Sequence, residues 1–189
     1  MELKFIDYIN LSMGEHEALL NIRNSDYVRL EGLNTNVIAI KEHLQWVASL
    51  IKNKEKKYYA VTLDGEIVGG INLFDVDNNQ AHWGLFFRAN INPLVPSISA
   101  YLLFDRVFLG MSLERLLLEV KCNNVNACKF DMNFGFSVVN QFELGGCQYY
   151  KMSQTRSDWL INKDKPILRF ISKKIQGITY QFVEAKEEL

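Results

Sequence analysis

Two side chains in the sequence are suited to taking a proton from a nucleophile. His82 lies in an apolar segment, and the near-neutral pKa of a histidine suits proton abstraction. Glu119 lies in the apolar run 116–120, where an unpaired carboxylate would be costly. Each has a structural alternative, because strand histidines are often structural and Glu119 can form a salt bridge with Arg23. The pattern therefore predicts two candidate general bases.

A second set of side chains is suited to binding an acceptor molecule. Arg23 can hold a diphosphate through two parallel hydrogen bonds, and Trp46 can stack on a base or a sugar. His43 and Trp46 are three residues apart and share one face of a predicted helix. Asn24, next to Arg23, belongs to the same set. Core packing is the alternative for Trp46, and we interpret His16 as a surface helix residue.

Composition and motifs narrow the class of protein. The 189 residues are 48% hydrophobic and 12% aromatic, as in a globular domain, and a net charge of −1 offers no global field to nucleic acid or an anionic membrane. No apolar run approaches the about 18 residues that cross a bilayer, and the N-terminus lacks a signal-peptide core. Three cysteines without ligand-like spacing indicate free thiols in a reducing compartment. We expect a soluble, cytoplasmic domain without a metal, dinucleotide or nucleoside-triphosphate site, since none of those motifs occurs.

Apolar periodicity and turn residues predict the elements that position these side chains. Strands are expected at residues 3–9, 57–63, 66–74, 81–88, 116–120, 137–144 and 147–161, with hairpin turns at Asp64-Gly65 and Gly145-Gly146 and a turn at 75–80. Helices are expected at residues 12–24, 37–52, 100–109 and 127–134. Ser12 and Glu15 form a capping box for the first helix, and Asn34, Thr35 or Asn36 can cap the second. Residues 90–99 are expected to be a loop, and 178–183 a strand.

The block from Leu116 to Phe136 carries the most specific pattern. A short apolar strand is followed by an asparagine-rich turn, a short helix and a Gly-Phe pair. Asn124, Ala127, Gly135 and Phe136 resemble the signature of the GNAT N-acetyltransferases. Where that family usually has the tyrosine that acts as general acid, this chain has Asp131.

The resemblance, which covers roughly residues 15–160, implies an α/β GNAT fold. In that fold a mixed, mostly antiparallel central sheet of about seven strands carries flanking helices in the order β-α-α-β-β-β-α-β-α-β-β. The predicted elements follow the same order. We expect residues 1–162 to form a single acyltransferase domain and residues 163–189 to be a C-terminal extension packed on or beside it.

The resemblance also implies acetyl-CoA as the acyl donor, with no metal. In such folds backbone N–H groups at a helix N-terminus hold the donor's pyrophosphate. The corresponding segment, residues 92–100, has no glycine and two prolines, and its serines can either cap the helix or offer hydroxyl groups to a phosphate. The resemblance assigns the donor to Leu85, Phe86, Ser97, Ile98, Ser99, Ala100, Asn124, Ala127 and Phe130.

The departure at Asp131 bears on catalysis. Asp131 can replace the tyrosine only if burial raises its pKa by several units, so that it stays protonated near neutral pH. The alternative is a solvent-facing helix carboxylate, with water or the substrate protonating the leaving thiolate. His82, Glu119 and Asp131 are thus the candidate catalytic residues.

A narrower likeness is to the amino-sugar N-acetyltransferases of the pseudaminic-acid pathway. It rests on Ile22-Arg23-Asn24, His43-Leu44-Gln45-Trp46, Trp83-Gly84-Leu85 and Leu118-Glu119-Val120. It implies a small primary amine, such as a nucleotide-linked amino sugar, as acceptor, bound by Arg23, Asn24, His43, Trp46 and Trp83, and it leaves a homodimer open. Acetyl transfer would be direct attack in a ternary complex. Two alternatives stay open: a degenerate GNAT domain that binds without turnover, and an enzyme that takes its acyl group from a carrier protein.

Overall fold

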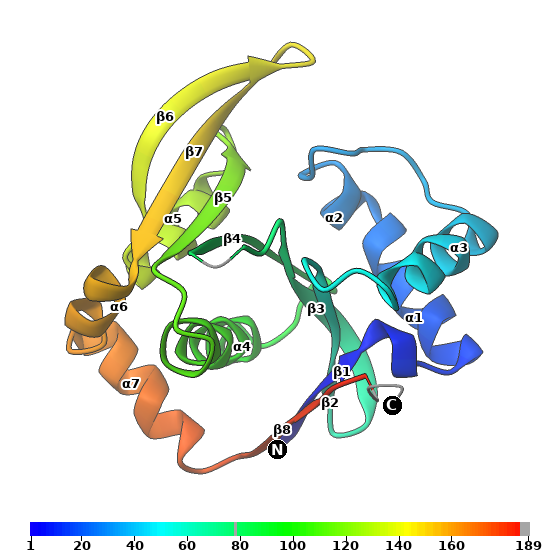
Figure 1. The fold of residues 1–189 in the computed structure, drawn as a ribbon, viewed down its shortest axis with the longest axis horizontal. Helices are drawn as coiled ribbons and strands as arrows, with labels where there is room; N and C mark the ends of the chain where they lie inside the picture. Colours follow the sequence, from blue (N-terminus) through cyan, green and yellow to red (C-terminus); the bar gives the residue numbers. More distant parts are fainter. Residues whose placement is uncertain (78, 186–189) are drawn as a thin grey trace.

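A single mixed sheet runs through the molecule (Figure 1). The computed structural model describes residues 1–77 and 79–185, so the expected turn at 75–80 and the C-terminal extension each reach partly outside the described residues. Within them, the strands lie in the order β6-β7-β5-β4-β3-β2-β1-β8. Their bounds are β1 Glu2–Asp7, β2 Lys57–Leu63, β3 Glu66–Phe74, β4 Gln80–Phe87, β5 Arg115–Lys121, β6 Ser137–Leu144, β7 Cys147–Thr155 and β8 Thr179–Val183. The predicted fold class is confirmed, with β8 as an edge strand beyond the expected seven.

Helices cover both faces of this sheet (Figure 1). Helices α1 (Met13–Asn24) and α3 (Ile40–Leu50) pack on one face through a small apolar cluster that includes Leu19 and Val47. The larger core on the other face holds α4 (Leu94–Asp105), α5 (Val125–Phe134), α6 (Arg156–Asn162) and α7 (Pro166–Ile175). Two short helical turns, Tyr8–Asn10 and α2 (Asp26–Arg29), flank α1, and a π-helical turn at Arg106–Gly110 extends α4. None of the described helices is long and apolar enough to cross a bilayer.

Strand β4 contributes side chains to both faces because strand residues alternate. Ala81, Trp83 and Phe87 are buried in the larger core, whereas Phe86 packs against the cluster under α1 and α3. The same alternation places His82 on the face of Phe86. The strand therefore separates two chemically different environments.

Strands β4 and β5 are parallel and pair only where they begin. Their partners are Gln80 with Arg115, Ala81 with Leu116 and His82 with Leu117; within the described chain no further pair joins them. Past this point β4 continues along β3 and β5 continues along β7. The two strands thus separate toward their C-terminal ends.

The block from β5 to β6 folds as predicted. The Asn124 side chain caps α5 by accepting a hydrogen bond from Ala127 N at 3.1 Å. Gly135 ends the helix with φ of +105°, in the left-handed region that favours glycine. A Cβ at Gly135 would lie 2.8 Å from Gln154 Nε2 and closer still to the Asn162 side chain. Glycine is therefore required here for both backbone conformation and space.

The expected loop at 90–99 is wrong beyond Pro93. Helix α4 begins at Leu94 with Pro93 as its N-cap, so neither Ser97 nor Ser99 caps it. Pro96 falls in the first turn, where a missing N–H costs no intrahelical hydrogen bond. Two prolines that suggested a loop in fact mark a helix start.

Two other boundaries also differ from the expectation. Helix α3 starts at Ile40 with Ala39 as N-cap, not at residue 37, and none of the expected cap residues 34–36 caps it. Strand β7 ends at Thr155, because Thr155 and Asp158 form a capping box that starts α6. Helices α2, α6 and α7 were not predicted. The expected terminal strand is confirmed as β8, which pairs parallel to β1.

Replacing Gly135 with alanine tests the α5–β6 junction. We expect Gly135→Ala to lower the free energy of unfolding by about 3 kcal/mol, because left-handed strain of about 1–2 kcal/mol adds to overpacking of about 1–3 kcal/mol. Gly65→Ala is the control: Gly65 has φ of +92° but open space around its Cβ position. It should cost about 1 kcal/mol from strain alone. Urea unfolding curves measure both, and equal costs would contradict the close contact.

Candidate active site

A cavity of about 470 Å³ lies between the helices α1 and α3 and the sheet. It is lined by Tyr8, Leu19, Leu20, Arg23, Asn34, Ile38, Glu42, His43, Trp46, Tyr58, Asn72 and Phe86. Three of the five residues expected on the acceptor side, Arg23, His43 and Trp46, therefore meet in one place. We refer to this cavity as the acceptor pocket.

Aromatic rings form one wall of the acceptor pocket. Trp46 and Tyr58 meet edge to face with 4.7 Å between ring centroids, and Tyr8 lies 5.7 Å from Tyr58. Burial raises the pKa of the Tyr8 and Tyr58 hydroxyl groups, so both are neutral donors at physiological pH. A wall of this kind suits a planar base or the apolar face of a sugar.

Arg23 brings positive charge to the pocket. Its Nη2 donates to the backbone oxygen of Asn34 at 2.9 Å, whereas its Nη1 is buried and has no hydrogen-bond partner among the described residues. Desolvation lowers the pKa of Arg23 from its ordinary value, but a guanidinium remains charged at neutral pH. A buried donor without an acceptor is costly, and an anionic ligand would satisfy it.

His43 is paired with a second histidine behind the pocket wall. His16 Nδ1 and His43 Nε2 lie 3.1 Å apart, and both side chains are buried. The interpretation of His16 as a surface residue was therefore wrong. Burial lowers the pKa of both imidazoles, that of His43 to about 4, so both rings are neutral at pH 7.

Two expected acceptor residues lie outside the pocket lining. Asn24 binds the backbone of Ile38 through both ends of its amide, at 2.9 Å each, and so fixes the segment before α3. Trp83 points to the opposite face of the sheet, where it packs edge to face on Phe104 at 4.6 Å. Its alternate position along β4 explains why it cannot share a face with Phe86.

The two expected bases are also outside the pocket. Glu119 is exposed, not buried, and it forms no ion pair with Arg23 within the described chain. His82 is stacked on Phe74 and its Nδ1 lies 3.7 Å from Asp75 Oδ2. His82 and Phe86 are four residue steps apart along β4, which corresponds to about 13 Å.

Asp131 is buried on the inner side of α5, together with Cys128 and Phe134. The expected alternative of a solvent-facing carboxylate is wrong, because the side chain is only 6% exposed. Desolvation raises the pKa of Asp131 to about 8. The carboxyl group is therefore predominantly protonated at pH 7, as the expected proton donor at this position must be.

Comparison with known proteins finds acetyltransferases that are similar to this chain. No family model matches the chain. The acetyltransferase PseH of Campylobacter jejuni is 23% identical over 139 residues, which cover 74% of this chain and 87% of the relative. The structure of C. jejuni PseH in complex with acetyl coenzyme A covers 81% of this chain and 98% of its own, with 20% identity and a TM-score of 0.65.

Two further structures show the same architecture. Spermidine N-acetyltransferase from Vibrio cholerae, in complex with CoA and spermine, has a TM-score of 0.72 at 15% identity and covers 84% of this chain and 96% of its own. FdhC, a nucleotide-linked sugar GNAT, has a TM-score of 0.70 at 18% identity and covers 88% of this chain and 92% of its own. This chain has the GNAT fold. The predicted GNAT fold is confirmed, and two of these relatives are named as acetyltransferases, one of them in complex with acetyl coenzyme A.

The donor side of this GNAT fold departs from the expected arrangement. Ser97 and Ser99 lie inside α4, and their hydroxyl groups donate to Pro93 O at 2.9 Å and Val95 O at 2.8 Å. Ile98 and Ala100 are fully buried. At the helix start, Leu94 N donates to the Asn92 side chain and Val95 N to the Asn92 backbone. The beginning of α4 therefore offers few free N–H groups to a phosphate.

The other expected donor residues lie closer to the separated strands. Leu85 and Phe86 belong to the part of β4 that no longer pairs with β5. Ala127 and Phe130 on α5 are half-buried against the larger core, and Asn124 caps that helix. Residues 89–92, which connect β4 to α4, make no backbone N–H hydrogen bond to another described residue. This connection, not the helix start, carries the available donors.

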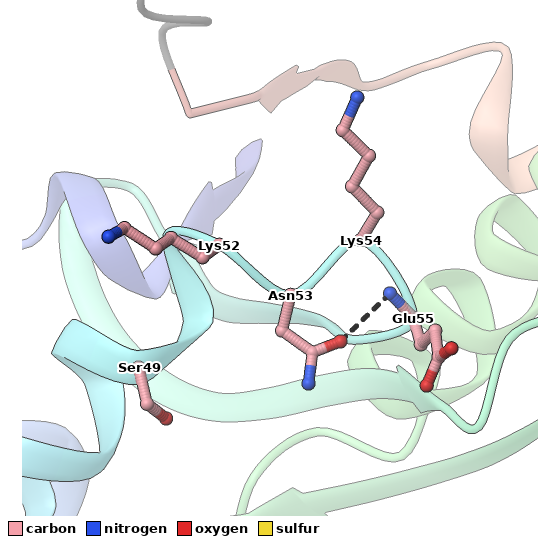
Figure 2. Close-up of a pocket in the computed structure, with 5 residues that line it drawn as sticks. All are labelled: Ser49, Lys52, Asn53, Lys54 and Glu55. Carbon is pink, nitrogen blue, oxygen red and sulfur yellow. Dashed lines mark hydrogen bonds between the residues drawn. The ribbon is translucent and has the colours of Figure 1, made fainter.

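A second hollow lies at the turn between α3 and β2 (Figure 2). It is lined by Ser49, Lys52, Asn53, Lys54 and Glu55. Asn53 uses its side-chain oxygen within the turn, accepting from Glu55 N at 3.0 Å, and Figure 2 shows the two lysines pointing apart. The end of α3 and the turn that follows it provide the lining, and its polar groups do not converge.

Several pocket residues could not be found from the sequence. Tyr8 and Tyr58 meet because β1 and β2 pair antiparallel with Asp7 opposite Tyr59, a register that no nearby turn fixes. The His16–His43 contact behind the pocket could not be found either, because the relative rotation of α1 and α3 depends on tertiary packing. Asn72 could have been noticed in the sequence, because it is a polar residue within the otherwise apolar strand β3.

The burial of Asp131 predicts a pH-dependent stability. The folded protein keeps the Asp131 proton up to about pH 8, whereas the unfolded chain loses it near the ordinary value of 3.8. Between these values the folded state binds more protons, so its stability falls as pH rises, by about 1.4 kcal/mol per unit. Asp131→Asn removes this loss and should be more stable than wild type at pH 8.

Urea unfolding of wild type and Asp131→Asn at pH 4, 6 and 8 measures the effect. The two proteins should nearly coincide at pH 4, where both side chains are neutral, which makes that pH an internal control. A difference that stays constant from pH 4 to pH 8 would show that the carboxyl group is not desolvated.

Proposed function

We propose that this chain is an N-acetyltransferase that moves an acetyl group from acetyl-CoA to a primary amine held in the acceptor pocket. The observation that carries the proposal is the buried, protonated Asp131 at the position where the resembling enzymes have their general acid. A solvated carboxylate would be ionised at pH 7 and unable to donate. The fold and the similarity to acetyltransferases support the same reaction class.

The finer proposal is that the acceptor is a nucleotide-linked amino sugar. Arg23 offers an unpaired buried donor to a phosphate, and the Trp46–Tyr58 wall offers a stacking surface. The lining contains one carboxylate, Glu42, which is a poor match for a polyamine with several ammonium groups. FdhC, a nucleotide-linked sugar GNAT, shares the fold, as does the spermidine N-acetyltransferase, so the choice rests on the charges and rings of the pocket.

The residues divide the chemistry as follows. When bound, acetyl-CoA supplies the acyl group as a thioester. Asp131 holds a proton for the thiolate that leaves when the amine attacks the carbonyl carbon directly. Arg23 and the aromatic wall orient the acceptor. His82 and Glu119 lie outside the pocket, and His43, with a pKa of about 4, is a hydrogen-bond partner and not a base. We therefore assign deprotonation of the amine to solvent.

The donor fits the connection between β4 and α4. The N–H groups of residues 89–92 are free of partners within the described chain, so they can meet the pyrophosphate where the start of α4 cannot. Leu85 and Phe86 lie on the part of β4 that does not pair with β5. The acyl-bearing arm of acetyl-CoA would run beside this part. Asn124, Ala127 and Phe130 support this side from α5.

A second candidate is favoured by the occupied donors at the start of α4. A GNAT domain that binds without turnover, or one that accepts its acyl group from a carrier protein, would not need a strong pyrophosphate site there. The carrier-protein enzyme would lack acetyl-CoA binding at micromolar concentration, and the non-catalytic domain would transfer no acetyl group, so binding and turnover measured together separate both from the first proposal.

Acetyl-CoA binding and transfer test the proposed reaction. We expect micromolar binding by calorimetry, and acetylation of a UDP-linked amino sugar that falls above about pH 8 as Asp131 loses its proton. Asp131→Asn should bind acetyl-CoA like wild type but lower kcat by about 10²-fold or more, the usual size of general acid catalysis. Absence of binding at millimolar acetyl-CoA would exclude the acetyl-CoA enzyme.

Arg23 distinguishes the two classes of acceptor. Charge-assisted hydrogen bonds contribute about 1.5–3 kcal/mol, so Arg23→Met should raise KM for the UDP-linked amino sugar by about 10- to 100-fold. KM for a neutral or cationic amine such as spermidine should change little. Arg23→Lys is the matched control that keeps the charge but loses the planar fork. An equal loss for both acceptors would indicate that Arg23 only supports the loop at Asn34.

A further inference from the structure

The His16–His43 pair joins two helices behind the acceptor pocket. His16 comes from the first turn of α1 and His43 from the first turn of α3. Their rings meet edge to face, with 5.1 Å between centroids and 3.1 Å between His16 Nδ1 and His43 Nε2. His43 lines the acceptor pocket, whereas His16 does not. The pair therefore connects a pocket side chain to one that cannot itself reach a ligand.

The contact couples the tautomers of the two rings. Both imidazoles are neutral because burial lowers their pKa values, so one facing nitrogen must donate and the other accept. If His43 Nε2 donates, both rings are Nε2–H tautomers; if His16 Nδ1 donates, both are Nδ1–H tautomers. An isolated neutral histidine prefers the Nε2–H form. When His43 Nε2 donates, both rings therefore have the tautomer that an isolated histidine prefers.

We propose that His16 is a positioning residue that fixes the rotation and tautomer of His43, leaving His43 Nδ1 as a lone-pair acceptor for an N–H or O–H group of the molecule in the acceptor pocket. The inference rests on the proposed function for the identity of that molecule. It assigns a role to a side chain that the sequence alone placed on the surface. His16 itself touches no substrate.

Packing around the pair supports a fixed orientation. His43 is 6% and His16 5% exposed, and the His43 ring also lies against Tyr8 and Trp46, with centroids 6.1 and 5.9 Å away. A ring held on three sides still has two tautomers, and a hydrogen bond strengthens the intrinsic preference for one of them. The His16 contact is the one that the structure provides at Nε2.

The histidine side-chain nitrogens give a direct test. The chain has three histidines, so ¹⁵N spectra of the imidazole rings contain few signals, and His43→Asn and His82→Asn identify them. In wild-type protein without ligand, His43 should show a protonated Nε2 and an unprotonated Nδ1. His16→Leu should give His43 signals averaged between tautomers. His16→Asn, which keeps a polar atom near the Nδ1 position, should preserve the wild-type signals.

The result that would overturn the proposal is an Nδ1–H tautomer of His43 in wild type, or His43 signals that His16→Leu leaves unchanged. Circular dichroism and urea unfolding show that the variants are folded. If His16→Leu does not fold, the tautomer in the wild-type spectrum still decides between the two arrangements.

Kinetics with a UDP-linked amino sugar extend the test to function. A neutral hydrogen bond contributes about 1 kcal/mol, so His16→Leu should raise the acceptor KM by about fivefold with kcat nearly unchanged. His16→Asn should stay within about twofold of wild type, which a purely structural role for the ring would not predict. If the wild type transfers no acetyl group, the proposed function fails, and the spectra still confirm or overturn the pairing.

Discussion

The short pairing between β4 and β5 is the constraint on which the rest of the molecule depends. Three residue pairs hold the two parallel strands together at their beginnings, and each then follows its other neighbour. Strand β5 can leave β4 because β7 pairs with it over its full length. Helix α5 starts from the end of β5, so this divergence also determines where Asp131 lies relative to β4. A longer β4–β5 ladder would remove the divergence between these two strands.

Burial gives the polar groups on each face a definite protonation state. On the α4 side, desolvation keeps the Asp131 carboxyl group protonated. On the α1 side, it keeps His16 and His43 neutral, while Arg23 stays charged with one unpaired donor. All these groups reduce the stability of the folded protein relative to apolar replacements. The chain tolerates them around one pocket and one helix, which is the distribution expected when burial serves chemistry rather than packing.

The parts of the fold that could be predicted from sequence are those fixed by local interactions. The capping box of Ser12 and Glu15, the Asn124 cap and the left-handed Gly135 each involve residues a few positions apart. The start of α4 was missed because Pro93 and Pro96 satisfy a helix N-terminus as well as a loop. The acceptor pocket was partly predictable, since His43 and Trp46 share one face of a helix, but the burial of His16 and the exposure of Glu119 depend on contacts between distant elements. Burial of Asp131 could be stated only as a condition, because one turn of helix determines which side faces the core.

The chain has the GNAT fold, but the proline-containing start of α4 leaves few backbone N–H groups that could bind a phosphate. Pro93 and Pro96 provide no N–H group, and the Asn92 side chain and backbone occupy the next two donors. A pyrophosphate bound as we propose would be held by residues 89–92, where Asn90 adopts φ of +60° without glycine. A connection built this way presents its N–H groups from an exposed turn instead of from a helix dipole, so it gives up part of the electrostatic stabilisation of the anion.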